Sequence, residues 1–276
     1  MTTEPLRVGA VSYLNAKPLY HRMESIAPEV MLSMDVPSRL AEKLAAGEVD
    51  VALIPSVEYL RGSGRGYRII PGFAIAARGP VLSVKLFTRT PWNQIDRLAL
   101  DAGSRTSQAL AQIWLWLAHG VRPAVVEELP LGVSALECTA DAVLVIGDRA
   151  MRVPEAPFQD SVDLGEAWYR MTGLPFVFAL WVARAGVELG DLPSVLEQCR
   201  ALGLAEAPLL ADIHGQRLGL EYATCYDYLT RVLSYDLGPR ELAGLRRFAE
   251  LAAELGLVNE GVQFVFHDDR DLVKRG

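Results

Sequence analysis

The run of residues 50–55 constrains the fold most strongly, because its apolar residues follow one another without alternation. A strand that is hydrophobic on both faces is typical of a parallel sheet covered by helices. Residues 7–13 and 31–36 form two earlier apolar runs, and residues 39–46 carry leucines at helical spacing before Gly47, a typical helix-ending residue. This strand–helix–strand order predicts an α/β fold with right-handed crossovers.

A second α/β series follows later in the chain. Its predicted strands and helix are residues 97–101, 104–119, 124–129 and 142–146. Extended segments near residues 85–90 and 174–180 are natural places for the chain to cross between two lobes. We therefore expect a discontinuous first lobe of residues 1–88 plus 180–276, a second lobe of residues 89–179, and a ligand cleft between them.

The charge balance argues against a nucleic-acid partner. The 276 residues include 27 Lys and Arg against 34 Asp and Glu, a net charge of −7, whereas nucleic-acid binders usually carry a basic surface. No signal-peptide pattern opens the chain, and no apolar run reaches the roughly 18 residues of a membrane span. The three cysteines form no CxxC pair, and the histidines match no metal-ligand spacing. We expect a cytoplasmic protein without a metal or other cofactor.

Residues 101–107, with the sequence DAGSRTS, are the strongest candidate for an anion site. They follow a predicted strand and open a long predicted helix, where backbone N–H groups have no partner within the helix. Ser104, Thr106 and Ser107 add three hydroxyls, and Arg105 adds a positive charge. The pattern favours a carboxylate site, and the alternative is that Ser104 is an ordinary helix N-cap.

Further candidates lie near the ends of predicted strands, where open α/β sheets bind their ligands. Ser12 and Asn15 follow the first strand, and Asn15 offers both a donor and an acceptor, although a helix N-cap is an alternative role. Ser56 precedes a predicted helix of the first lobe. Ser83 is a polar residue inside an apolar strand, so it faces either solvent or the cleft.

Asp148 ends a predicted strand of the second lobe and is a further candidate for a ligand contact. The alternatives are a structural pair with its neighbour Arg149 or a helix cap. The sequence contains no HExxH, no P-loop pattern and no GxSxG. It therefore supports no catalytic triad, metal centre or redox cofactor.

Seven short motifs, taken together, carry a family resemblance. They are GAVSYLNAKP at 9–18, GEVDVALIP at 47–55, RGPVLSV at 78–84, DAGSRTS at 101–107, IGD at 146–148, DLGEAW at 163–168 and PFVFA at 175–179. This set, spread over roughly residues 6–185, resembles the chorismate dehydratase family of the futalosine route to menaquinone. The resemblance implies a two-lobed, type II periplasmic-binding-protein-like fold.

The resemblance also implies a lyase that dehydrates chorismate to 3-[(1-carboxyvinyl)oxy]benzoate. In the implied mechanism the proton on C3 leaves first, with the substrate's own enolpyruvyl carboxylate as the base, and the C4 hydroxyl then departs. Asn15 and Ser83 are implied to lie nearest the reacting centre. Ser104, Thr106 and Ser107 are implied to hold a carboxylate.

Two other functions stay open. The sister enzyme of the same route, 1,4-dihydroxy-6-naphthoate synthase, has a histidine base where this sequence has Gly147, which argues against that activity. A non-catalytic binding protein for a small carboxylate has the same implied fold. Formation of an aromatic product from chorismate distinguishes the dehydratase from such a receptor.

Overall fold

The first lobe is built on a six-stranded sheet. The computed structural model describes residues 4–267. The strands are β1 (Arg7–Val11), β2 (Met31–Asp35), β3 (Val51–Pro55), β4 (Arg68–Ala77), β10 (Phe176–Ala183) and β11 (Leu233–Ser234), in the order β11-β4-β10-β3-β1-β2. β1 is parallel to β2 and β3, whereas β10 is antiparallel to both β3 and β4. The sheet is therefore mixed. The sequence pattern predicted a parallel sheet, and the antiparallel strand β10 is the difference.

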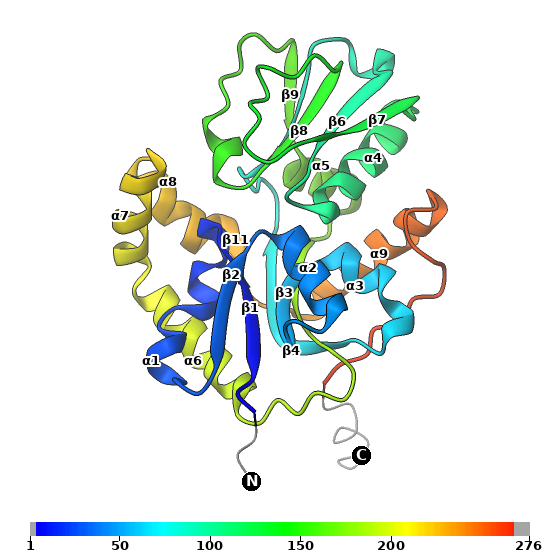
Figure 1. The fold of residues 1–276 in the computed structure, drawn as a ribbon. Helices are drawn as coiled ribbons and strands as arrows, with labels where there is room; N and C mark the ends of the chain where they lie inside the picture. Colours follow the sequence, from blue (N-terminus) through cyan, green and yellow to red (C-terminus); the bar gives the residue numbers. More distant parts are fainter. Residues whose placement is uncertain (1–3, 268–276) are drawn as a thin grey trace.

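The second lobe is built on a five-stranded sheet. Its strands are β5 (Val84–Thr88), β6 (Arg97–Asp101), β7 (Val125–Leu129), β8 (Ala142–Ile146) and β9 (Asp160–Asp163), in the order β7-β6-β8-β5-β9. β6 is parallel to β7 and β8, and β5 is antiparallel to β8 and β9. Figure 1 shows this sheet standing apart from the larger one, with narrow chain crossings between them.

Helices surround both sheets. The α-helices are α1 (Met23–Ile26), α2 (Pro37–Ala46), α3 (Ser56–Arg61), α4 (Arg105–His119), α5 (Leu164–Thr172), α6 (Leu192–Ala205), α7 (Ala207–Leu218), α8 (Tyr222–Asp227) and α9 (Pro239–Glu254). Two shorter turns matter for the site: the 3-10 helix η1 (Leu14–Tyr20) and the π-helical turn η5 (Tyr228–Val232). In Figure 1, α6, α7 and α8 lie on one side of the larger sheet, and α3 and α9 lie on the other.

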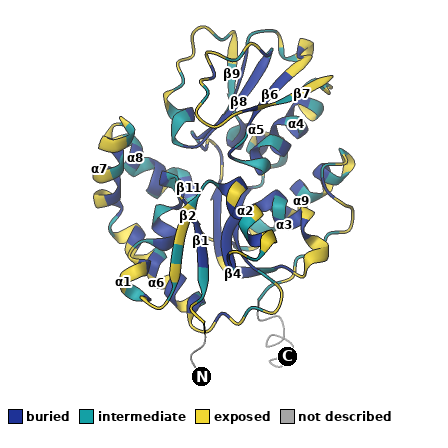
Figure 2. Cartoon of the chain, viewed as in Figure 1, coloured by how far each residue is buried: buried dark blue, intermediate teal, exposed yellow. Residues whose placement is uncertain are grey.

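Burial agrees with the unbroken apolar run of residues 50–55. Every residue of β3 is buried, and so is every residue of its neighbour β10. Figure 2 shows the middle of the larger sheet mostly buried, while exposed residues lie on the outer sides of the helices. Covering β3 from both sides explains why its apolar residues do not alternate with polar ones. No helix within residues 4–267 is long and apolar enough to cross a membrane.

Sheet membership differs from the expected lobe boundaries by a few residues. β5, at residues 84–88, pairs with β8 and β9 of the second sheet, although the expected first lobe ran to residue 88. β10 begins at residue 176 and pairs within the first sheet, although the expected second lobe ran to residue 179. Strand pairing is non-local, so the sequence does not reveal which sheet an extended segment joins. The lobe division itself stays a prediction.

Candidate active site between the lobes

A small cavity, with a volume of about 40 Å³, lies where the lobes meet. Its lining includes side chains from both lobes and from the crossing segment between β4 and β5. The lining residues are Val11, Tyr13, Asn15, Pro37, Pro55, Ile75, Val81, Ser83, Val84, Ser104, Ser107, Ile146, Gly147, Phe178 and Ala179. None of these described residues carries a formal charge. The cavity is therefore mostly apolar, with a few hydroxyls and one amide available for hydrogen bonds, as small-molecule sites usually are.

Asn15 lines this cavity from the 3-10 helix η1. The residue at the N-cap of η1 is Tyr13, and no side chain caps that helix, so the alternative N-cap role for Asn15 is wrong. The Oδ1 atom of Asn15 is buried and has no hydrogen-bond partner among the described residues. An unpaired buried acceptor costs about 1–3 kcal/mol. Asn15 therefore presents an unsatisfied acceptor to a ligand.

Ser83 lines the cavity from the crossing segment and is 2% exposed. Its Oγ accepts a hydrogen bond of 2.7 Å from the Tyr228 hydroxyl. The preceding Leu82 has a φ of 65°, a left-handed conformation that non-glycine residues rarely adopt. The Asp163 carboxylate holds this turn by accepting hydrogen bonds from the backbone N–H groups of Val81 and Leu82, at 3.0 and 2.6 Å. The side chain of Ser83 is therefore fixed by its surroundings.

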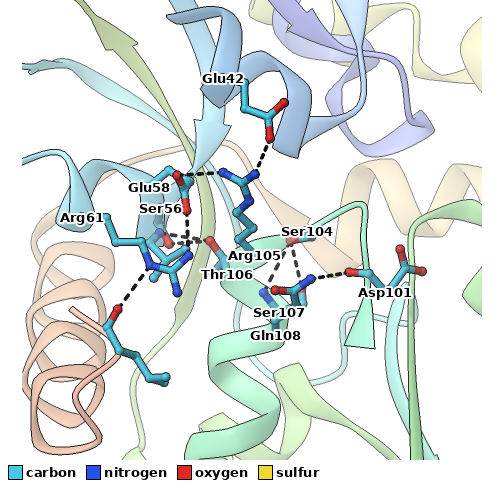
Figure 3. A network of polar contacts seen from close by, with 12 residues as sticks. Glu42, Ser56, Glu58, Arg61, Asp101, Ser104, Arg105, Thr106, Ser107 and Gln108 are labelled. Atoms are coloured by element: carbon cyan, nitrogen blue, oxygen red, sulfur yellow. Dashed lines mark hydrogen bonds and ion pairs between the residues drawn. The ribbon is translucent and has the colours of Figure 1, made fainter. Parts of the chain in front are cut away.

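Two of the predicted anion-site residues, Ser104 and Ser107, line the cavity at the start of α4. The Oγ of Ser104 accepts a hydrogen bond from the Ser107 backbone N–H, so the N-cap role of Ser104 is confirmed. The two hydroxyl oxygens lie 3.2 Å apart (Figure 3). A capping serine at the cavity edge is compatible with a ligand contact, because its hydroxyl proton is still available for donation.

Arg105 and Thr106 do not line the cavity. The Arg105 guanidinium turns away from the serines and forms ion pairs with Glu58, at 3.2 Å, and with Glu42 (Figure 3). The buried Thr106 Oγ1 accepts a hydrogen bond of 3.1 Å from the Val57 backbone N–H. Both residues therefore connect α4 to the helices of the first lobe, and a contact of either with the substrate stays a prediction.

Ser56 and Ser12 also lie outside the lining. Ser56 is fully buried, and its hydroxyl donates a hydrogen bond of 2.7 Å to the Val177 carbonyl oxygen. Its Oγ also lies 3.4 Å from the Thr106 Oγ1. Ser12 is exposed, and its backbone N–H donates to the Asp35 carbonyl oxygen at 3.0 Å. The structure therefore gives Ser56 a bracing role and gives Ser12 no place in the cavity wall.

Asp148 contacts the first lobe and does not line the cavity. Its carboxylate accepts a hydrogen bond from the Leu14 backbone N–H, and burial raises its pKa from 3.8 to about 6. The alternative pairing with Arg149 is wrong, because the Arg149 guanidinium pairs with the fully buried carboxylate of Asp101, at 2.5 and 3.1 Å. Asp148 is thus placed to hold the segment that carries Asn15.

Tyr13 and Tyr228 are two residues of the site that sequence reasoning did not single out. Tyr13 packs on Gly103 and Gly147 of the second lobe, where an added Cβ would lie 2.7 Å from its hydroxyl and 3.3 Å from its ring. Gly103 and Gly147 lie in the motifs at 101–107 and 146–148, and Tyr13 lies in the motif at 9–18. Membership of these motifs was the one sequence feature that pointed to Tyr13. Tyr228 lies 145 residues from Ser83, and no local pattern marks it.

Solved structures share the fold of this chain. A protein from Archaeoglobus fulgidus has a TM-score of 0.71 and 15% identity, covering 94% of this chain and 100% of that one. The periplasmic aliphatic sulphonate binding protein from Escherichia coli has a TM-score of 0.63 and 14% identity, covering 97% and 94%. The chain therefore has a periplasmic-binding-protein-like fold, as the family resemblance implied.

The chain belongs to the menaquinone biosynthesis family, whose model matches residues 6–254. A chorismate dehydratase from Thermus thermophilus is 32% identical over 263 residues, covering 89% of this chain and 94% of that relative. A second chorismate dehydratase, from Campylobacter jejuni, is 24% identical over 255 residues, covering 90% and 98%. The expected family and the expectation of an enzyme are confirmed. The match also extends past residue 185, where the motifs ended.

Proposed function

We propose that this protein dehydrates chorismate to 3-[(1-carboxyvinyl)oxy]benzoate. The observation that carries the proposal is the meeting of Asn15, Ser83, Ser104 and Ser107 around one cavity in a chain related to chorismate dehydratases. This set can orient a small polar substrate and stabilise charge on it. Orientation and preorganised hydrogen bonds are the main sources of rate acceleration when no covalent catalyst takes part.

Chorismate is a dianion, and helix starts supply the positive potential that the neutral lining lacks. Pro37 at the first turn of α2 and Ser104 at the start of α4 both line the cavity. Each helix start carries the equivalent of about half a positive charge. The chain's net charge of −7 opposes this weakly, because salt screens exposed charges beyond about 8 Å.

The proposed reaction matches a cavity that offers no protein base. The proton on C3 passes to the substrate's own enolpyruvyl carboxylate, and the electron pair left on C3 is delocalised into the ring diene and carboxylate. Expulsion of the C4 hydroxyl then forms the aromatic ring, and the hydroxyl leaves as water with the proton that was removed. Asn15 orients the carboxylate or the hydroxyl, and Ser83 donates a hydrogen bond to the departing oxygen.

The test is purified protein with chorismate, without added metal or cofactor, followed by mass spectrometry and ultraviolet absorbance. We expect a product that is lighter by one water and has a benzoate-type spectrum. Asn15→Ala and Ser83→Ala should each lower kcat by about 100-fold, the usual cost of losing one such hydrogen bond. Full turnover by both variants would refute their assignment, and chorismate binding without turnover would instead support a receptor.

The geometry also bears on the sister activity. Gly147 has a φ of 70°, and a Cβ at this position would lie 3.3 Å from the Tyr13 ring. A histidine base at residue 147 would therefore meet both backbone strain and the Tyr13 side chain. This supports the dehydratase over 1,4-dihydroxy-6-naphthoate synthase.

A further inference from the structure

A fully buried hydroxyl from the C-terminal part of the chain reaches Ser83. Tyr228 begins the π-helical turn η5, which packs against η1 and β11. Its side chain is 0% exposed, and its hydroxyl lies 2.7 Å from the Ser83 Oγ. π-Helical turns are uncommon and are often found at functional sites.

The Tyr228 phenol keeps its proton. Burial raises the pKa of Tyr228 above its usual value of 10, and this outweighs the influence of the hydrogen bond with Ser83, which lowers it. Tyr228 is therefore a neutral phenol that donates its proton to the Ser83 Oγ.

This arrangement dictates where the Ser83 proton points. The phenol occupies one acceptor position on the Ser83 Oγ, and no acceptor among the described residues takes the Ser83 hydroxyl proton in a hydrogen bond. Ser83 lines the cavity, so its proton is free to point into it. Without Tyr228, the Ser83 hydroxyl could rotate and turn a lone pair towards the substrate instead.

We infer that Tyr228 is a positioning residue, which fixes Ser83 as a hydrogen-bond donor to the departing hydroxyl. The inference rests on the proposed dehydratase function. Burial of a tyrosine does not by itself explain the hydrogen bond between Tyr228 and Ser83. Tyr235 is also buried, at 3% exposed, yet its hydroxyl has no hydrogen-bond partner among the described residues.

Tyr228→Phe tests the inference, with Tyr235→Phe as the matched control. Each change removes one buried hydroxyl and keeps the ring. We expect Tyr228→Phe to lower kcat for chorismate by about tenfold, the value of one hydrogen bond, with KM within about twofold. Tyr235→Phe should keep both constants. An unchanged kcat in Tyr228→Phe, or an equal loss in Tyr235→Phe, would overturn the inference.

The double variant Ser83→Ala/Tyr228→Phe separates positioning from general damage to the fold. If Tyr228 acts through Ser83, the double variant should be no slower than Ser83→Ala alone, because groups that act as a unit are non-additive. A full further tenfold loss would mean that Tyr228 acts elsewhere. A wild-type protein inert towards chorismate would refute the proposed function, whereas active wild type with unaffected Tyr228→Phe would refute the positioning role alone.

Discussion

The backbone N–H of Leu14 donates a hydrogen bond to the carboxylate of Asp148, with 3.2 Å between the nitrogen and Oδ1. This contact joins the first lobe to the second immediately beside Asn15. Burial of the Asp148 carboxylate raises its pKa from 3.8 to about 6, although the hydrogen bond from Leu14 itself lowers the pKa. Burying this carboxylate between the lobes therefore has a cost that depends on pH.

The first prediction concerns this cost. Between about pH 4 and 6 the folded chain holds a proton on Asp148 that the unfolded chain has lost, so the contribution of Asp148 to stability falls as pH rises through that window. Asp148→Asn removes this slope and keeps an acceptor for Leu14. At pH 7 we expect the variant to be more stable by about 1–2 kcal/mol, less than the full shift implies because solvent partly screens the site.

Urea unfolding of the wild type and Asp148→Asn at several pH values between 4 and 7 measures the effect. The difference in unfolding free energy should grow with pH. Asp191→Asn is the control, because Asp191 is exposed and its side chain makes no cap hydrogen bond. A difference that stays constant across the range would show that the Asp148 carboxylate is not the source.

The central strands and the cavity serines were predictable because their signals are local. The unbroken apolar run of β3 indicates a strand that is covered on both sides, and this pattern can be recognised from a few consecutive residues. Ser104 and Ser107 follow a strand and open a helix, and both line the cavity. Asn15 and Ser83 also line it, whereas their catalytic roles stay predictions.

Other parts of the site depend on contacts that no local pattern contains. Arg105 was expected to face a carboxylate because of its charge, but Glu42 and Glu58, from two other helices, hold it elsewhere. Tyr228 reaches Ser83 from a helical region without a diagnostic motif. A charged side chain lies where its ion-pair partners are. The tertiary fold determines which partners are near, so a local sequence pattern does not reveal the position of that side chain.

The second prediction concerns Ser56, which sequence reasoning assigned to the substrate. In Ser56→Ala the buried Val177 carbonyl loses its hydrogen-bond donor, so the free energy of unfolding should fall by about 1–3 kcal/mol. Because the Ser56 hydroxyl does not line the cavity, kcat and KM for chorismate should stay within about twofold. Steady-state kinetics beside urea unfolding tests both, and a large rise in KM at unchanged stability would restore Ser56 to the substrate site.

The third prediction concerns the contact of Tyr13 with Gly103. A Cβ at residue 103 would lie 2.7 Å from the Tyr13 hydroxyl and 3.1 Å from the Asp101 Oδ1 and the Ile146 side chain. Gly103→Ala should therefore hold the lobes apart and raise KM for chorismate about tenfold, since overpacking costs about 1–3 kcal/mol.

Removing the nearest clashing atom should reverse part of this effect. In Gly103→Ala/Tyr13→Phe the added methyl group no longer meets the phenol oxygen, so KM should move back towards that of Tyr13→Phe alone. Steady-state kinetics of the two single variants and the double variant measures the recovery. If the effects of the two substitutions on KM are additive, the close approach of Tyr13 and Gly103 does not limit closure of the lobes.

The fourth prediction concerns the buried carboxylate of Asp101, which supports the start of α4. It accepts hydrogen bonds from the backbone N–H groups of Gly103 and Ile146, at 2.8 and 3.0 Å, and pairs with Arg149. Asp101→Asn keeps the shape but removes the charge and one acceptor oxygen. We expect a loss of about 3 kcal/mol in unfolding free energy, because the arginine loses its counter-charge where water has limited access.

An exposed ion pair of the same sheet provides the comparison for Asp101. Arg97 and Glu127 lie 3.0 Å apart with side chains 48% and 36% exposed, so Glu127→Gln should change stability little. Urea unfolding of both variants under identical conditions measures the contrast. Equal losses would mean that burial of Asp101 does not set the strength of its pairing. A loss in Asp101→Asn alone would show that this carboxylate stabilises the turn from β6 to α4, which ends at Ser104.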